Sequence, residues 1–255
     1  MTTKRTRMLG RLPSQNDRRT IRFDQIARPW AITLPPAVNW DKAIAEWGVA
    51  GNDRYGNCVI ATAAHLLLTW RANESHDARP ITDQAVIALS REMGALDGYN
   101  ILDRLKYWRT TGMFGDNLWA FTSLSPQNID HVKLAIFTLG AADIGVNLPR
   151  AWQNADEWDV GYGPAYRPGT WGGHSVPLVG YDANNVYAVT WGQIIPMTWP
   201  ALAYYCDEAY ALIDSQWITQ QGKSPVGLDL PSLHAALCDI DADDLDIQSD
   251  PPKRS

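Results

Sequence analysis

The sequence has no long hydrophobic run and few cysteines. No apolar stretch among its 255 residues approaches the roughly 20 residues that a membrane-spanning helix needs, so we expect no membrane partner. Three cysteines form an odd, sparse set, which favours free thiols over a disulfide framework. The basic N-terminus is not followed by an apolar core, which argues against Sec export by a signal peptide.

Several chemistry-bearing patterns are also missing from the sequence. There is no paired-cysteine zinc motif, and His174 has no nearby Cys, His or acid at ligand spacing, so we expect no metal site. No glycine-rich loop with a phosphate-binding lysine links a strand to a helix, so we expect no nucleotide and no other cofactor. The formal net charge of -6 argues against nucleic acid as the main partner.

Charge of one sign collects at each end of the chain. Residues 1–22 hold seven basic side chains and one acid, whereas 239–250 hold six aspartates and no base. Charged ends are usually solvated, so we interpret 1–37 as a basic arm and 239–255 as an acidic tail. Docking, with the two ends pairing or a partner binding one of them, is the alternative.

Helical periodicity comes first along the chain and strand patterns come second. Helices are predicted at 57–73, 82–93, 101–111 and 128–139, with a short last helix from Pro231. Strands are predicted at 142–147, 176–181, 186–190 and 209–213, with a hairpin turn at 182–185. Helices followed by antiparallel strands indicate the α+β class.

Cys58 is the most informative single residue. It follows a glycine-bearing loop, 51–57, and opens the most strongly predicted helix. The positive end of the helix dipole favours the thiolate, which is the nucleophilic form of cysteine. Amide groups of the loop can bind an oxyanion. A small buried hydrophobic role for Cys58 is the alternative.

His174 is the preferred proton partner for this thiol. It ends a glycine-rich approach, 169–174, and begins a buried strand, and glycines there let a backbone or substrate come close. His65 follows Cys58 by two helical turns, roughly 10 Å, so we interpret it as a core histidine. The other three, in a loop or on amphipathic helices, are His76, His131 and His234.

Four segments in this order resemble papain-like cysteine proteases. They are the Val-Asn-Trp entry and Asn-Cys-Val-Ile-Ala helix start within 38–63, the helix, glycine turn and strand at 134–146, the Gly-His-Ser-Val-Pro-Leu-Val-Gly-Tyr-Asp strand at 173–182, and Val-Thr-Trp-Gly at 189–192. The resemblance implies a papain-like domain at 38–238. It would have a helical lobe at about 38–125, a twisted antiparallel sheet or barrel lobe at about 126–238, and a cleft between them.

The same resemblance implies roles for individual residues. Cys58 would be the nucleophile and His174 the base, and Asn52, six residues before the cysteine, takes the place of the oxyanion-hole glutamine. The position of the histidine-orienting asparagine holds Thr190, which has less reach and no amide carbonyl. Gln193 and the Trp191 backbone are alternative partners of the histidine.

Two functional hypotheses follow. The first is a papain-like cysteine hydrolase that cleaves a peptide or protein substrate through a thioester. The second is a weakly active or inactive papain-like scaffold used for binding or assembly, for example with other proteins of a bacteriophage virion. The short segment before the domain and the absence of paired cysteines favour a cytoplasmic or virion-associated protein. Other thiol acyl-transfer enzymes, including transglutaminase-like and cell-wall amidase types, remain as a third class.

Overall fold

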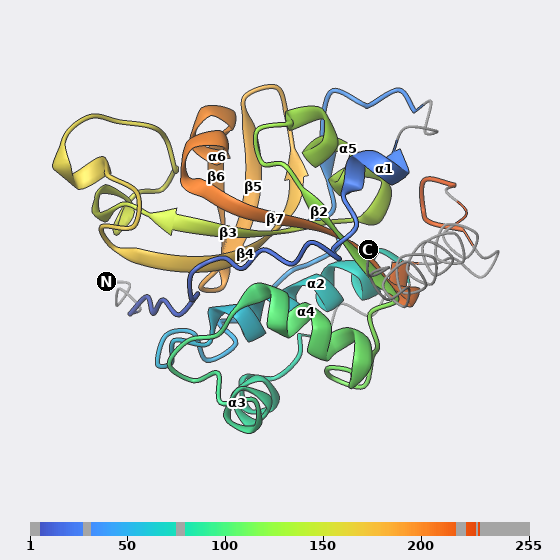
Figure 1. The fold of residues 1–255 in the computed structure, drawn as a ribbon, viewed down its shortest axis with the longest axis horizontal. Coiled ribbons are helices and arrows are strands. Elements are labelled where there is room, and N and C mark those ends of the chain that lie inside the picture. Colours follow the sequence, from blue (N-terminus) through green and yellow to red (C-terminus); the bar gives the residue numbers. More distant parts are fainter. Residues whose placement is uncertain (1–5, 28–31, 75–79, 218–222, 228, 230–255) are drawn as a thin grey trace, which may run out of the picture.

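Helices lie on both sides of a twisted sheet (Figure 1). The computed structural model describes residues 6–27, 32–74, 80–217, 223–227 and 229. The helices are α1 (Phe23–Ala27), α2 (Cys58–Glu74), α3 (Asp83–Glu92), α4 (Ile101–Thr110), α5 (Ile129–Leu139) and α6 (Trp199–Tyr205), with short 3-10 turns at Arg150–Trp152, Pro164–Tyr166 and Ser215–Trp217. No helix in these described ranges is long and apolar enough to cross a membrane.

The sheet is antiparallel and open. Its strands are β1 (Val38–Asn39), β2 (Ala120–Leu124), β3 (Ala142–Leu148), β4 (Gly172–Tyr181), β5 (Asn185–Thr190), β6 (Gln193–Thr198) and β7 (Cys206–Ile213). The order is β2-β7-β3-β4-β5-β6, and β1 pairs with β4. Of the sheet and barrel alternatives, the structure therefore has a sheet. The α+β class is confirmed.

Helix α2 is buried on nearly every side. Its sequence is rich in alanine and leucine, and fourteen of its seventeen residues are buried, as expected for an apolar helix in the middle of a domain. It packs against β4 and against α3 and α4. Because the helix begins at Cys58, this packing places the thiol at the junction between the helical layer and the sheet.

Most predicted elements are present, with ends shifted by a few residues. The predicted hairpin is confirmed as β4 and β5, which pair antiparallel. Five helices and strands of the described residues were missed: α1, β1, β2, β6 and α6. Strand β6 contains Pro196, which argues against a central strand, but β6 lies at one end of the sheet, where a missing N–H is tolerated. The helix predicted from Pro231 lies outside the described residues.

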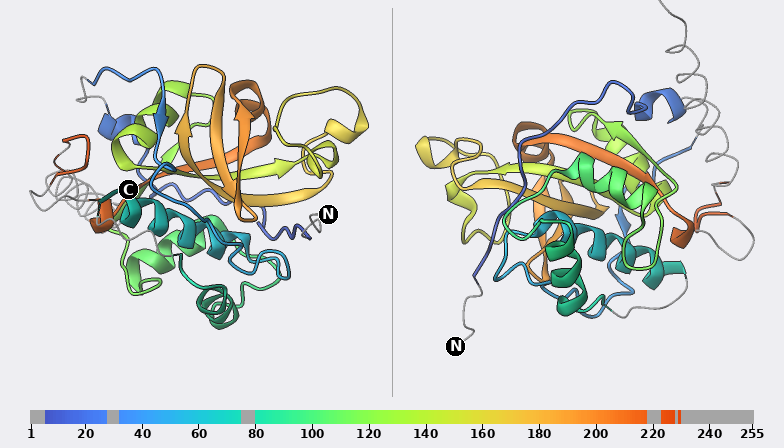
Figure 2. Two further views of the ribbon diagram at one scale, coloured as in Figure 1. Left: turned by 180° about the vertical axis from the view of Figure 1, so that it is seen from behind. Right: turned by 60° about the horizontal axis from the view of Figure 1, so that its bottom comes forward.

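The basic N-terminal segment does not behave uniformly. Arg18 and Arg19 are exposed, as the solvated interpretation expects. The side chain of Arg11 is instead only 1% exposed. From residue 6 onward the segment crosses between the sheet and the helices (Figures 1 and 2). The many basic residues predicted a solvated segment. Arg11 instead pairs with two acidic residues of β7, and the sequence pattern does not show this pairing.

A fully buried ion pair joins the two layers. Arg104 of α4 donates to Asp143 of β3, and neither side chain is exposed. Burial raises the pKa of Asp143, and the Arg104 guanidinium opposes that shift. Removing one partner of such a pair leaves an uncompensated charge in the interior, which is strongly unfavourable.

Replacing Asp143→Ala should lower the free energy of unfolding by about 3–5 kcal/mol, because Arg104 is left without its counterion. Urea denaturation would measure the change. Asp24→Ala is the matched control, since Asp24 pairs with Arg22 at the surface and should cost less than about 1 kcal/mol. Equal losses in the two variants would show that the buried pair does not hold the layers together.

Candidate active site

Cys58 lies at the first position of α2, and its loop is fixed from within. The Asn57 carbonyl accepts from Ile60 N at 2.9 Å, and Asn57 Nδ2 donates to the Ala50 carbonyl at 3.0 Å. Cys58 is 1% exposed. Burial raises the pKa of its thiol from 9.0 to about 11, although the backbone N–H groups of Ser175, Gly10 and Val59 favour the thiolate. Ser175 directly follows His174 in β4, so this contact brings the two elements together.

His174 is completely buried and is held on one side only. Its Nε2 lies 2.7 Å from Thr190 Oγ1. Its Nδ1 is buried and has no hydrogen-bond partner within the described part of the chain. Burial lowers the pKa of His174 to about 3, and Arg11 and Arg7 lower it further. In this structure the thiol and the imidazole are therefore both neutral.

A tight hairpin turn covers the histidine with an indole. Trp191 and Gly192 join β5 to β6 with φ values of 49° and 77°, the positive pair that a two-residue hairpin loop requires. The Trp191 ring stacks on His174, with centroids 4.4 Å apart and planes 14° apart. Cys58, Thr190 and Trp191 line one small cavity, and both Thr190 and Trp191 contact His174.

Asn52 also lines this cavity, but its side-chain amide donates hydrogen bonds within its own loop. Its Nδ2 donates to the Tyr55 carbonyl at 3.0 Å and, more weakly, to Asn57 Oδ1 at 3.4 Å. The Asn52 side chain thus stabilises the loop in this structure. Gln193, the alternative partner of the histidine, is exposed, whereas Thr190 makes the contact.

The remaining histidines and Asp182 make other contacts, although His65 lines the same cavity as Cys58. His65 is buried, packs edge-on against Trp47, and has Nε2 3.3 Å from the Gly48 carbonyl; burial lowers its pKa to about 4. It is the core histidine that the sequence predicts. His131 is half-buried, and Asp182 bonds to Tyr187 in the β4–β5 hairpin. The two histidines that lie outside the described residues are His76 and His234.

The N-terminal segment crosses the site, a feature that the sequence patterns did not predict. Met8 N donates to the Asn52 carbonyl at 3.1 Å, and the Met8 carbonyl accepts from Trp191 Nε1 at 3.2 Å. The Arg7 guanidinium lies over the Trp191 ring, 4.9 Å from its centroid. Residues 7 and 8 thereby cover the indole that covers His174.

Gly10 lies against the nucleophile, and Arg11 follows it beside His174. A Cβ built on Gly10 would be 1.7 Å from the Gly56 carbonyl oxygen, so only glycine fits where the segment meets the Cys58 loop. Arg11 N donates to the Gly173 carbonyl at 3.1 Å, beside His174. The Gly10 carbonyl accepts from Tyr99 N at 2.8 Å. We call residues 7–12 the covering segment.

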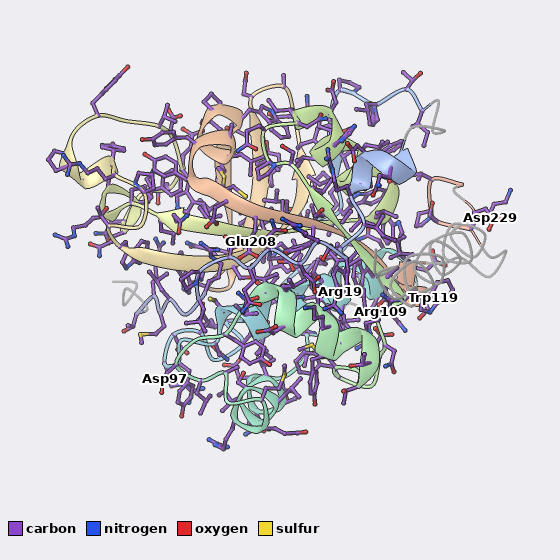
Figure 3. The ribbon with its side chains drawn as sticks, viewed as in Figure 1. Arg19, Asp97, Arg109, Trp119, Glu208 and Asp229 are labelled. Carbon is purple, nitrogen blue, oxygen red and sulfur yellow. The ribbon has the colours of Figure 1, made fainter. Side chains whose placement is uncertain are left out.

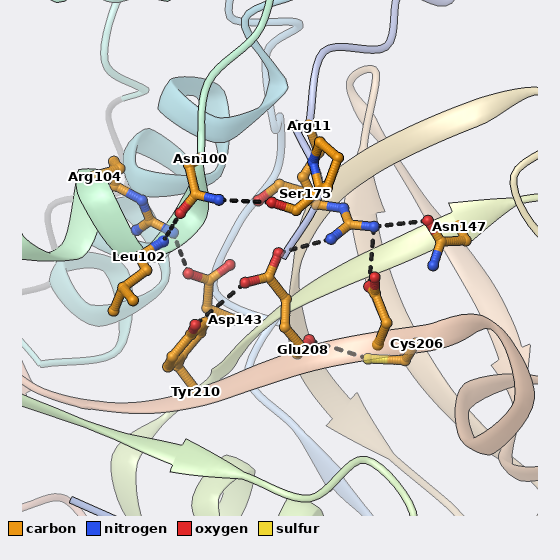
Figure 4. A network of polar contacts seen from close by, with 12 residues as sticks. Arg11, Asn100, Leu102, Arg104, Asp143, Asn147, Ser175, Cys206, Glu208 and Tyr210 are labelled. Carbon is orange, nitrogen blue, oxygen red and sulfur yellow. Dashed lines mark hydrogen bonds and ion pairs between the residues drawn. The ribbon is translucent and has the colours of Figure 1, made fainter. Parts of the chain in front are cut away.

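The Arg11 side chain fills a buried acidic pocket (Figure 4). Its guanidinium contacts Glu208 at 2.7 Å and Asp207 at 2.9 Å, both on β7, and Asn147 Oδ1 on β3 at 2.8 Å. Figure 3 shows Glu208 where β7 passes the N-terminal segment. The signal available in the sequence was an acidic pair, Asp207-Glu208, within an apolar strand. That signal does not identify a partner 197 residues away.

Comparison with solved structures shows the same fold in cysteine proteases. Xylellain, a cysteine protease from Xylella fastidiosa, matches with a TM-score of 0.59 and 16% identity over 83% of this chain and 98% of its own. Digestive procathepsin L 3 of Tenebrio molitor matches with 0.54 and 14% over 82% and 75%. A cysteine protease of Carica candamarcensis matches with 0.53 and 16% over 70% and 98%. No family model and no curated protein sequence matches the chain.

The chain therefore has the papain-like fold, and the fold expected from the sequence is confirmed. The site described above occupies the contact between its helical layer and its sheet. Within the described residues, no group of three or more His, Cys, Asp or Glu side chains is placed to hold a metal ion.

The intact protein should react slowly with iodoacetamide at Cys58. A rise of the thiol pKa from 9.0 to about 11 lowers the thiolate fraction at pH 7 about 100-fold, and the thiolate is the reacting form. Mass spectrometry of alkylated peptides over pH 6–11 would follow Cys58 separately from the other two thiols. Rapid alkylation of the intact protein near pH 6 would mean that the covering segment leaves the thiolate–imidazolium pair intact.

Proposed function

We propose that this protein is a papain-like cysteine hydrolase that cleaves peptide or amide bonds, with Cys58 as nucleophile and His174 as general base. The observation that carries the proposal is the position of the imidazole. Thr190 holds Nε2 at 2.7 Å, the buried Nδ1 has no partner within the described residues, and Cys58, at the N-terminus of α2, lines the same cavity as Thr190. A base oriented on one nitrogen and open on the other is what nucleophile activation needs.

The proposed reaction begins when the covering segment leaves the site. The S–H bond of Cys58 breaks, its proton moves to His174 Nδ1, and the sulfur attacks the substrate carbonyl. Thr190 Oγ1 accepts from Nε2–H of the resulting imidazolium. The C–N bond then breaks as the imidazolium returns the proton to the leaving amine. Water cleaves the thioester, which releases the acid and restores the thiol.

The tetrahedral oxyanion needs hydrogen-bond donors near the sulfur. The N–H groups of the first turn of α2 have no acceptor within the helix, and the Cys58 N–H is the first of them. We assign Asn52 as the second donor. Its 3.4 Å contact with Asn57 is the weaker of its two bonds and is the one that Asn52 would exchange for the oxyanion.

The resting protein is latent under this proposal. Arg7 and Arg11 both disfavour the imidazolium of His174, and the segment that carries them lies against the thiol. Displacing the segment admits water, which relieves the desolvation that acts most strongly on both groups and so favours the ion pair. Arg11 opposes the imidazolium but favours the thiolate.

Gly10→Val should convert the latent protein into an active one, because the added side chain cannot fit against Gly56. We expect hydrolysis of a mixed fluorogenic peptide library and alkylation of Cys58 near neutral pH, both well above wild type. Ser14→Val, at an exposed position of the same segment, is the control and should behave as wild type. Activity that survives in Gly10→Val/Cys58→Ala would contradict the assignment of the nucleophile. An inert thiol in Gly10→Val would favour the scaffold hypothesis.

Thr190→Val, tested in the Gly10→Val background, should lower kcat about 10- to 100-fold, the cost of a hydrogen bond to a charged group. The alkaline limb of the pH–rate profile should also move to lower pH, because the imidazolium loses an acceptor. Thr122→Val is the matched control, since the buried Thr122 hydroxyl has no hydrogen-bond partner within the described ranges. An unchanged pH profile for Thr190→Val would rule out Thr190 as a positioning residue.

A further inference from the structure

The pocket around Arg11 is more buried and makes more hydrogen bonds than a surface ion pair does. The guanidinium is 1% exposed and the Glu208 side chain 5%. Both terminal nitrogens of Arg11 are bonded: Nη1 to Glu208, and Nη2 to Asp207 and Asn147. Tyr210 donates to the second Glu208 oxygen at 3.2 Å. The pocket is therefore built around a cation.

The wall of the pocket is shaped to admit a long side chain. Gly145 on β3 pairs with Glu208, and the β3–β7 register shifts directly after it. A Cβ on Gly145 would lie 2.7 Å from Glu208 Cγ and 2.8 Å from Arg11 Cδ and Nη1. Any larger residue would close the space that the guanidinium occupies.

The residue that fills the pocket is adjacent in the chain to the residue that contacts Cys58. Arg11 N bonds to the carbonyl of Gly173, which precedes His174, and the residue before Arg11 lies against Cys58. A peptide whose carbonyl reaches the thiol can thus place a neighbouring side chain in this pocket. The covering segment itself does not bind as a substrate does. It offers the N–H of Gly10 to the thiol, while the Gly10 carbonyl is bonded to Tyr99 N.

We infer that the Arg11 pocket is the specificity pocket of this hydrolase, that it selects a substrate with a basic side chain close to the scissile bond, and that Arg11 occupies it in competition with that substrate. The inference rests on the proposed function. When the covering segment leaves, Glu208 and Asp207 lose their counterion, and this is unfavourable for Glu208 because its carboxylate is buried. An arginine from a substrate replaces the same bonds.

The first test compares peptide substrates in the full-length Gly10→Val variant, with Arg11→Ala as a second way of emptying the pocket. Fluorogenic peptides carry arginine, lysine, norleucine or glutamate at each position next to the scissile bond. We expect kcat/KM for arginine about 10- to 100-fold above norleucine, as for a lost hydrogen bond to a charged group. Glu208→Gln should remove most of this preference. Glu92→Gln, which changes an exposed acid, should leave it intact.

A second test does not depend on catalysis. A synthetic peptide of residues 6–13 (TRMLGRLP) is titrated calorimetrically into full-length Gly10→Val, next to the same peptide with norleucine in place of Arg11. The arginine peptide should bind at least about 10-fold more tightly, and Glu208→Gln should remove the difference.

The outcomes separate the two proposals. Hydrolysis without a basic preference, or with one that Glu208→Gln does not change, overturns the pocket assignment and leaves the hydrolase standing. Absence of hydrolysis with Arg11-dependent peptide binding overturns the hydrolase and shows a cation pocket that serves binding alone. Equal affinity of the arginine and norleucine peptides overturns the pocket in either case.

Discussion

Two carboxylates in the interior, Asp143 on β3 and Glu208 on β7, each require a cationic partner, and the arrangement of the surrounding elements supplies it. Burial raises the pKa of both, and each needs a cation because water cannot reach it. Arg104 comes from the helical layer and Arg11 from the N-terminal segment. The acids thus fix α4 against the sheet and draw the basic segment across the same junction. The nucleophile stands at that junction because α2 begins there.

The consequence for the chemistry is a conflict between burial and ionisation. The covering segment desolvates the thiol and the imidazole together, and its arginines repel an imidazolium. Stacking of Trp191 on the ring and the bond to Thr190 do not depend on this state, so they keep the histidine oriented while it is neutral. One set of residues, Trp191 and Thr190, therefore orients His174 for catalysis. A different set, in the covering segment, disfavours its protonated form.

The sequence was informative where local pattern decides the structure. An alanine- and leucine-rich run identified α2 and its start at Cys58, and a strand–turn–strand pattern identified the hairpin of β4 and β5. The resemblance to papain-like proteases, followed through that hairpin, identified Thr190 as the residue in the histidine-orienting position. Long-range pairing was not accessible in the same way. Seven basic residues near the N-terminus suggest solvation, and nothing local distinguishes Arg11 from its exposed neighbours. Its burial depends on acids in the last strand, which is a property of the tertiary structure.

The threonine beside the histidine has a further consequence. An amide carbonyl can only accept a hydrogen bond, whereas a hydroxyl can donate or accept by rotating about its C–O bond. Thr190 can therefore satisfy His174 Nε2 with or without its proton, and this contact does not select one tautomer of the neutral ring. The proton can reside on Nδ1, or on Nε2 facing the hydroxyl, with the ring in one place. Thr190 thus fixes the position of the imidazole ring and remains compatible with both of its neutral tautomers.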